Sequence, residues 1–206
     1  MKLSDIDQSR LKFPLLRKLL QDQMDAGVVS FKDLKSTIPK DSNFDQHGLV
    51  QDEFIASAGI TEVFDHYIQA DPNIAWNSGG WVSFGLALNK NSGEVYYPGD
   101  DFPGAQVGQV YYIHLVILGL KKLCMSQEIV KIDRENFQIV FSYIENGMTA
   151  GIQEIQFEPH SSGQTKVIHS SYFKGVSTFR DKFYPYFHSM IVSKFHENVI
   201  RSLTKS

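Results

Sequence analysis

The chain has 206 residues, enough for one domain with a sizeable core or for one domain with a small appendage. Its formal net charge of −3 gives no strong attraction to nucleic acid or to an anionic membrane surface, and its single cysteine excludes an internal disulfide. The first residues are polar and lack a signal-peptide core, and no apolar run is long enough to span a bilayer. These features predict a soluble, cytoplasmic protein with no nucleic-acid partner and no integral membrane segment.

Two helical segments are predicted near the N-terminus. A stripe of leucines favours a helix over 10–24, and Gly27 stands where a glycine commonly ends a helix. Ser30 and Asp33 have the spacing of a capping box, which predicts a second, short helix over 31–37. A helix-turn-helix that reads DNA would need a third periodic segment and a basic face, and neither is evident in the sequence.

A polar, turn-like stretch over 40–48 predicts a joint between these helices and the rest of the chain. The leucine stripe of the first helix must be buried against another part of the protein. We therefore expect residues 1–47 to form a helical N-terminal extension, as a packing support or a lid, on a main domain of residues 48–206.

The main domain is predicted to start with a strand, two short helices and a hairpin. Helical spacing, strand-like alternation and the turn at 91–93 indicate these elements. The expected ranges are a strand over 49–55, a helix over 58–67, a short helix that closes at 74–76, and strands over 81–88 and 94–97. The loop that follows holds Asp100 and Asp101, but it lacks the ligand pattern of a calcium loop.

A run of further strands fills the middle of the chain. Inside/outside alternation is cleanest around Ile155 and Phe157, which are flanked by polar residues. The expected strands cover 107–118, 128–133, 137–144, 154–158 and 165–173. Because short turns separate them, the pattern favours an antiparallel meander over parallel βαβ units.

The last long segment, 184–203, has the spacing of an amphipathic helix. Pro185 stands near its start, where a missing N–H costs a helix little. Large apolar residues recur four apart along it: Phe187, Ile191, Phe195 and Val199. One face of this helix is therefore built to be buried, and the simplest packing wraps the preceding sheet around it.

Several short patterns carry a resemblance to a known family. They are the opening strand 50–57 with the Val63–Phe64 pair behind it, Trp76 after the second short helix, Val107–Gly108 before a long strand, the late hairpin segments 151–157 and 163–167, and the terminal helix. In this order they resemble the START-like superfamily, also called SRPBCC, which includes plant pollen allergens, bacterial polyketide cyclases and steroid-carrying lipid-transfer domains. The resemblance covers about three-quarters of the chain, from about Leu49 to Leu203.

The resemblance implies an α+β helix-grip fold, in which a curved antiparallel sheet wraps around the long C-terminal helix and leaves an apolar cavity between them. In this family the cavity usually takes up a lipid, a sterol, a polyketide or another hydrophobic molecule. It therefore implies that the partner is a hydrophobic small molecule and that no cofactor is needed. A cyclase- or hydrolase-type enzyme that uses the same cavity, and a protein-interaction module, are the alternatives, because a fold does not by itself fix a function.

The candidate lining residues are mostly aromatic or aliphatic, with a few polar groups to orient a ligand. They are Trp76, Tyr112, His114, Phe141, Tyr143, Ile155, Phe157, Val167, His169, Phe187, Met190, Ile191 and Phe195. Tyr143 and His169 are expected to supply hydrogen bonds, and together with His114 they are the polar groups that an enzyme of this kind would use. A solid core made of the same residues is the competing interpretation.

The seven histidines and the lone cysteine show no metal-ligand spacing, so no metal site is expected. His188 and His196 are eight residues apart on the last helix and therefore share one face. Lys121 and Lys122 precede Cys124, and nearby cations favour a lowered thiol pKa. No convergent polar cluster is visible in the sequence, so no catalytic residue is assigned and binding is favoured over catalysis.

Overall fold

The computed structural model describes the whole chain except residues 39–43, 118, 120, 176 and 205–206. The expected joint at 40–48 therefore lies in part outside the described residues. Within the described part, one antiparallel sheet of eight strands has the order β1-β8-β7-β6-β5-β4-β2-β3. Its strands are β1 (Gly48–Ala56), β2 (Val82–Asn89), β3 (Val95–Tyr96), β4 (Gln109–Ile117), β5 (Lys121–Asp133), β6 (Gln138–Tyr143), β7 (Thr149–Pro159) and β8 (Thr165–Gly175).

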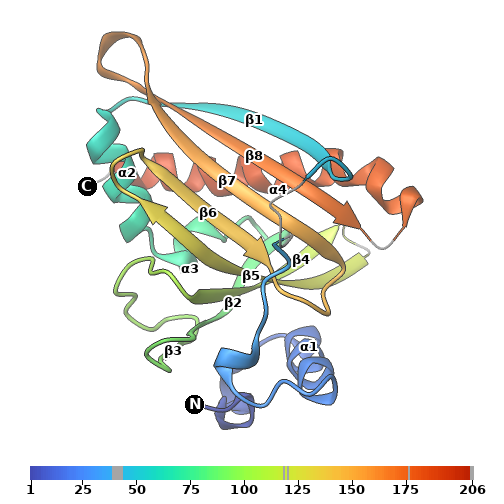
Figure 1. The fold of residues 1–206 in the computed structure, drawn as a ribbon. Helices are drawn as coiled ribbons and strands as arrows, with labels where there is room; N and C mark the ends of the chain where they lie inside the picture. The colour runs from blue at the N-terminus through green and yellow to red at the C-terminus, as the bar shows by residue number, and fades with distance from the viewer. Residues whose placement is uncertain (39–43, 118, 120, 176, 205–206) are drawn as a thin grey trace.

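The helices lie on both faces of this sheet. They are α1 (Pro14–Asp25), α2 (Ile60–Gln69), α3 (Pro72–Ala75) and α4 (Thr178–Leu203), with single 3-10 turns at Leu3–Asp5, Gln8–Arg10, Phe31–Asp33 and Ser161–Gly163. The sheet curves across α4, which lies behind it in Figure 1 and contacts β1, β8, α2 and α3. This arrangement confirms the predicted helix-grip fold.

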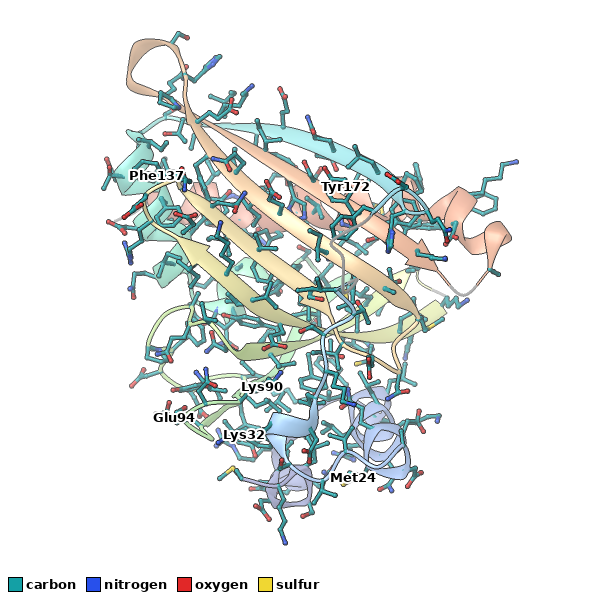
Figure 2. The ribbon with its side chains drawn as sticks, in the orientation of Figure 1. Met24, Lys32, Lys90, Glu94, Phe137 and Tyr172 are labelled. Atoms are coloured by element: carbon teal, nitrogen blue, oxygen red, sulfur yellow. The ribbon has the colours of Figure 1, made fainter. Side chains whose placement is uncertain are left out.

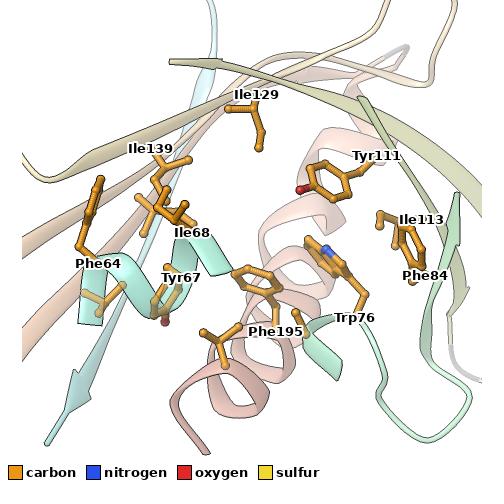
Figure 3. Packing of buried hydrophobic residues seen from close by; sticks show 14 of the residues in the cluster. Phe64, Tyr67, Ile68, Trp76, Phe84, Tyr111, Ile113, Ile129, Ile139 and Phe195 are labelled. Atoms are coloured by element: carbon orange, nitrogen blue, oxygen red, sulfur yellow. The ribbon is translucent and has the colours of Figure 1, made fainter. Parts of the chain in front are cut away.

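The main core fills the space between the sheet, α2, α3 and one end of α4. Figure 3 shows Tyr67 of α2, Trp76 after α3 and Phe195 of α4 close to one another beneath the strands. The Trp76 and Phe195 rings have centroids 4.4 Å apart, and Tyr67 packs edge-on against Phe157 of β7 at 5.0 Å. Aromatic side chains therefore close this end of the fold.

A second core lies on the opposite face, where α1 covers the sheet. Leu16 and Leu20 of α1 are fully buried with Leu86 and Tyr112, and the Tyr112 hydroxyl donates to Oε1 of Gln23 at 2.9 Å. The leucine stripe of the N-terminal segment is thus covered by the outer face of β2 and β4.

A polar contact also joins the N-terminal segment to this face. Lys90 lies between that segment and the sheet (Figure 2), and its ammonium donates to the carbonyl of Leu34 at 2.7 Å and to the carboxylate of Glu128 at 3.0 Å. Ser36 donates to the same carboxylate at 2.6 Å. The buried carboxylate of Glu128 therefore has one partner from the N-terminal segment, Ser36, and one from the main domain, Lys90.

Two breaks in strand register help to bend the sheet. The pairing of β2 with β4 shifts between Phe84 and Leu86, and the pairing of β5 with β6 shifts between Ile129 and Lys131. Bulges of this kind increase local twist and re-aim the strands. Gly85 stands at the first of them, where a side-chain carbon would lie 2.9 Å from the Tyr112 carbonyl oxygen, so only glycine fits there.

Several predicted boundaries differ from the structure: α1 begins at Pro14 rather than at residue 10, and β7 begins at Thr149 rather than at residue 154. Helix α4 begins at Thr178 rather than at residue 184, and Pro185 lies inside it. The contacts of Tyr184, which stacks on Phe173 at 3.9 Å and shares a hydrogen bond with Ser171, hold these early turns against β8 in spite of the proline.

Strand β5 begins at Lys121, seven residues before the predicted start, because its polar opening residues hid a partly exposed strand end. The predicted helix over 31–37 is a single 3-10 turn, Phe31–Asp33. The capping box of Ser30 and Asp33 is confirmed, since each side chain accepts from the backbone N–H of the other residue.

Candidate functional site

A cavity of about 620 Å³ lies between α4 and the inner face of β4, β5 and β6. This is within the range of small-molecule sites, which are commonly about 300–1,000 Å³. Most of its wall is apolar, from Trp76, Leu115, Ile117, Leu123, Met125, Phe183, Phe187, Ile191 and Val192. The interior of this half of the fold is therefore hollow, whereas the half beneath α2 is filled.

Two rows of α4 face the cavity. Phe183, Phe187 and Ile191 are four residues apart, and so are Tyr184, His188 and Val192. Residues at this spacing lie on one side of a helix, so α4 presents a broad face to the cavity rather than a narrow stripe. The opposite wall comes from Leu115 and Ile117 of β4 and from residues 121 and 123–126 of β5.

One end of the cavity is polar, and its groups are bonded to one another. Nε2 of Gln153 donates to the Tyr143 hydroxyl at 2.7 Å and to Oε1 of Gln127 at 3.2 Å. The Tyr143 and Tyr184 hydroxyls share a hydrogen bond, and Tyr184 shares another with Ser171 at 3.1 Å. These bonds link β5, β6, β7 and β8 to α4 at the point where Tyr143, Gln153 and Tyr184 line the cavity.

A buried chain of hydrogen bonds continues behind Gln153. Oε1 of Gln153 lies 3.0 Å from Nε2 of His169, Nδ1 of His169 lies 2.8 Å from Nε2 of His196, and Nδ1 of His196 lies 2.7 Å from the Tyr67 hydroxyl. Because a carbonyl oxygen only accepts, Nε2 of His169 carries the proton, and its Nδ1 accepts from His196. Nδ1 of His196 then accepts from Tyr67, so every donor in the chain points toward the cavity.

Burial keeps these imidazoles uncharged. Desolvation, followed by the nearby His196 and His188, holds the pKa of His169 well below its ordinary value. Burial also lowers the pKa of His196 to about 3. A neutral imidazole has one donor and one acceptor, which is the complement that the chain uses at each ring.

His188 differs from these two histidines. It is only 7% exposed and lines the cavity, yet neither ring nitrogen has a hydrogen-bond partner within the described residues. Its ring stacks on Tyr184 at 5.1 Å and meets His169 edge-on at 5.5 Å, and burial lowers its pKa to about 3. An imidazole buried without partners costs free energy, which a hydrogen-bonding group in the cavity would recover.

The sequence-predicted lining residues fall into several places in the structure. Trp76, Tyr143, Phe187 and Ile191 line the cavity. The apolar core beneath α2 and α4 takes Phe141, Ile155, Phe157, Val167 and Phe195. His169 lies behind Gln153 in the hydrogen-bond chain, and Met190 is on α4 but outside the lining.

Tyr112 and His114 lie on the other face of the sheet, away from the cavity. His114 stacks on Phe13 of the N-terminal segment, with ring centroids 4.2 Å apart, and Tyr112 bonds to α1 as described above. Along β4, Tyr111, Ile113 and Leu115 point inward, so the residues between them must point outward. The expectation that Tyr112 and His114 line the cavity is therefore wrong.

Sequence reasoning missed Gln153, Tyr184 and His188, which form the polar end. Gln153 is two residues before Ile155 and four before Phe157, so strand alternation places it on the same inward face. Tyr184 and His188 share the four-residue spacing of α4. The signal was present in each case, but it was carried by polar residues on faces assumed to be apolar.

The lone cysteine is not activated. Cys124 is partly buried, and burial raises its thiol pKa to about 12, so the expected lowering by nearby lysines is wrong. Among the described residues, no group of three His, Cys, Asp or Glu side chains could hold a metal ion. No helix in that part of the chain is long and apolar enough to cross a membrane.

No family model and no curated protein matches the chain, but solved structures do. A point mutant of norcoclaurine synthase from Thalictrum flavum, in complex with a transition-state analogue, has a TM-score of 0.57 at 11% identity over 77% of this chain and 94% of that one. The same synthase in complex with dopamine and hydroxybenzaldehyde has a TM-score of 0.56 at 11% identity over 77% and 87%.

Major latex-like protein 151 from Panax ginseng has a TM-score of 0.54 at 15% identity over 75% and 96% of the two chains. Identities this low show the fold alone. That fold is the helix grip implied by the START-like resemblance, and the match extends over almost the whole of these smaller chains.

Proposed function

We propose that the cavity binds a hydrophobic small molecule of the size and apolar character of a lipid, a sterol or a polyketide. The observation that carries the proposal is the hollow of about 620 Å³, with a mostly apolar wall and one polar end. Small-molecule sites generally have this composition, because apolar walls supply affinity and a few polar groups fix orientation. A solid core would leave no such volume.

The energetics of such binding are favourable. Removing a few hundred Å² of apolar ligand surface from water contributes several kcal/mol at about 25 cal/mol per Å². Association and ordering costs take back part of this, so affinities in the micromolar range are expected. The norcoclaurine synthase neighbour was solved with dopamine and hydroxybenzaldehyde, which supports small-molecule binding as a use of this fold.

Binding fits the polar end better than acid–base catalysis does. A general base for work near neutral pH has a pKa close to that pH, whereas the pKa of His188 is about 3. The hydroxyls of Tyr143 and Tyr184 are engaged in the bonds described above. We therefore keep a cyclase- or hydrolase-type reaction as the alternative and favour binding.

Native mass spectrometry of gently purified protein tests the proposal, with a co-purified molecule of lipid size as the expected result. Ile191→Trp fills the cavity from α4 and should remove the bound molecule while leaving the melting temperature largely unchanged. Met190→Trp is the matched control, because Met190 precedes Ile191 in the chain but its side chain lies outside the cavity lining. If Ile191→Trp instead unfolds the protein, the interior is already packed and the proposal fails in favour of a structural core.

A further inference from the structure

The polar wall of the cavity carries no buried charge. Tyr143, Gln153 and Tyr184 are neutral groups, and burial keeps His188 neutral as well. Among the lining residues described, the charged one is Lys121, which is exposed to water. A carboxylate or ammonium taken to the polar end would lose its hydration with no opposite charge to replace it. Pairing with an exposed lysine contributes little.

Some polar groups at this end of the cavity already have hydrogen-bond partners, whereas His188 has none among the described residues. The Gln153 amide donates to Tyr143 and Gln127 and accepts from His169, and the two tyrosine hydroxyls bond to each other. His188 stands beside them with neither nitrogen paired among the described residues. A ligand group that enters this end therefore meets one side chain whose donor and acceptor are both unused.

We infer that the ligand is an uncharged molecule whose hydroxyl group hydrogen-bonds to the neutral imidazole of His188, an inference that rests on the proposed binding function. A hydroxyl is both donor and acceptor, so it can pair with either nitrogen of the ring. Both nitrogens are covered by protein atoms, so the ring turns about its Cβ–Cγ bond to present one of them. That torsion is broad for histidine, so the turn carries little intrinsic torsional cost.

Displacement of the neutral fluorophore N-phenylnaphthylamine from the full chain tests this, with four ligands of equal chain length at about pH 8. Decanol, decanoate, decylamine and chlorodecane differ in the polar group alone, and the two ions are fully charged at this pH. Decanol should displace the probe at a concentration roughly tenfold lower than either ion does. A tenfold difference in affinity corresponds to about one hydrogen bond, which decanol forms where an ion would instead lose its hydration. His188→Phe should weaken decanol roughly tenfold and leave chlorodecane unchanged.

Two results would overturn the inference while the cavity proposal stands. In the first, decanoate binds the parent as tightly as decanol does but binds the Lys121→Met variant weakly. The ligand would then be an anion whose head group pairs with Lys121 at the exposed end of the cavity. In the second, decanol binds the parent and the His188→Phe variant with the same affinity. If neither the fluorophore nor any of the four compounds binds the parent protein, the proposed function itself is wrong and the inference falls with it.

Discussion

His169 of β8 and His196 of α4 share a buried hydrogen bond, with Nδ1 of the first 2.8 Å from Nε2 of the second. Both rings are almost fully buried, and each has another partner on its far nitrogen. The bond therefore links the sheet to the helix through two neutral imidazoles with fixed tautomers. It also sets the direction of the Gln153 amide, and through it the hydroxyl of Tyr143 at the cavity wall.

Replacing His196 with Phe is expected to lower the free energy of unfolding by about 1–3 kcal/mol. The change leaves the Tyr67 hydroxyl and Nδ1 of His169 buried without partners, and orphaned buried groups carry costs of this size. His188→Phe is the matched control on the same helix, and it should be neutral or stabilising because no bond is lost. Urea unfolding of both variants measures the difference, and equal destabilisation would contradict the hydrogen-bond chain.

Treatment with a metal chelator is expected to leave the stability of the protein and its ligand binding unchanged. The described residues offer no three-ligand group, and the histidines of the core are bonded to protein groups or covered by them. Dialysis against a chelator should leave the melting temperature and the binding of a fluorescent ligand unchanged. One equivalent of zinc or iron found by elemental analysis, and lost together with stability, would disprove this.

Deletion of residues 1–46 is expected to lower stability and to expose a sticky surface. The outer face of the sheet carries Leu86 and Tyr112, both with no exposed area while α1 covers them. An uncovered apolar patch of this kind promotes association. Light scattering and thermal unfolding of the truncated chain measure both effects, and a monodisperse protein as stable as the parent would argue against a packing role for 1–47.

A point substitution tests the same contact more gently. Leu20→Ala is expected to cost about 2–5 kcal/mol, as is usual for a large-to-small change in a well-packed core, because Leu20 is fully buried. Val29→Ala, at a position that is 59% exposed on the same segment, should stay within about 0.5 kcal/mol of the parent. Similar losses in the two variants would mean that α1 is not docked as described.

The sequence predicted which residues of a helix or strand face the cavity only where that element has a single buried face. Helix α4 has one buried side, so the four-residue spacing of Phe187 and Ile191 could be interpreted correctly, and both residues line the cavity. Strand β4 is covered on both faces, by the main core and by α1, and reads as an almost continuous apolar run. Alternation carries no signal in such a run, so Tyr112 and His114 could not be assigned to the outer face.

The polar end of the cavity was hidden for a different reason. Its groups come from β6, β7 and α4, and they become partners only when the sheet curves across the helix. Alternation with Ile155 and Phe157 places Gln153 on the inward face, but it does not show which groups Gln153 meets there. Convergence of this kind is a property of the fold, and no local pattern in the sequence could show it.

The last prediction concerns acid. His169, His188 and His196 have folded-state pKa values below the ordinary value of about 6.5, the latter two at about 3, because burial disfavours their charged forms. The unfolded chain therefore binds more protons than the folded one below about pH 6.5, and stability must fall as the pH drops through this range. Above that pH the contribution is complete and no dependence on these groups is expected.

Each such histidine contributes up to about 1.4 kcal/mol per pH unit between its two pKa values. Urea unfolding at several pH values between about 7 and 4 should therefore show a steep loss. His188→Phe removes one of these groups without breaking a bond, so its stability should fall less steeply than that of the parent. His160→Phe, at an exposed position, is the control and should follow the parent. Parallel slopes for His188→Phe and the parent would show that His188 is not buried neutral, and would also remove the basis for its pairing with an uncharged ligand.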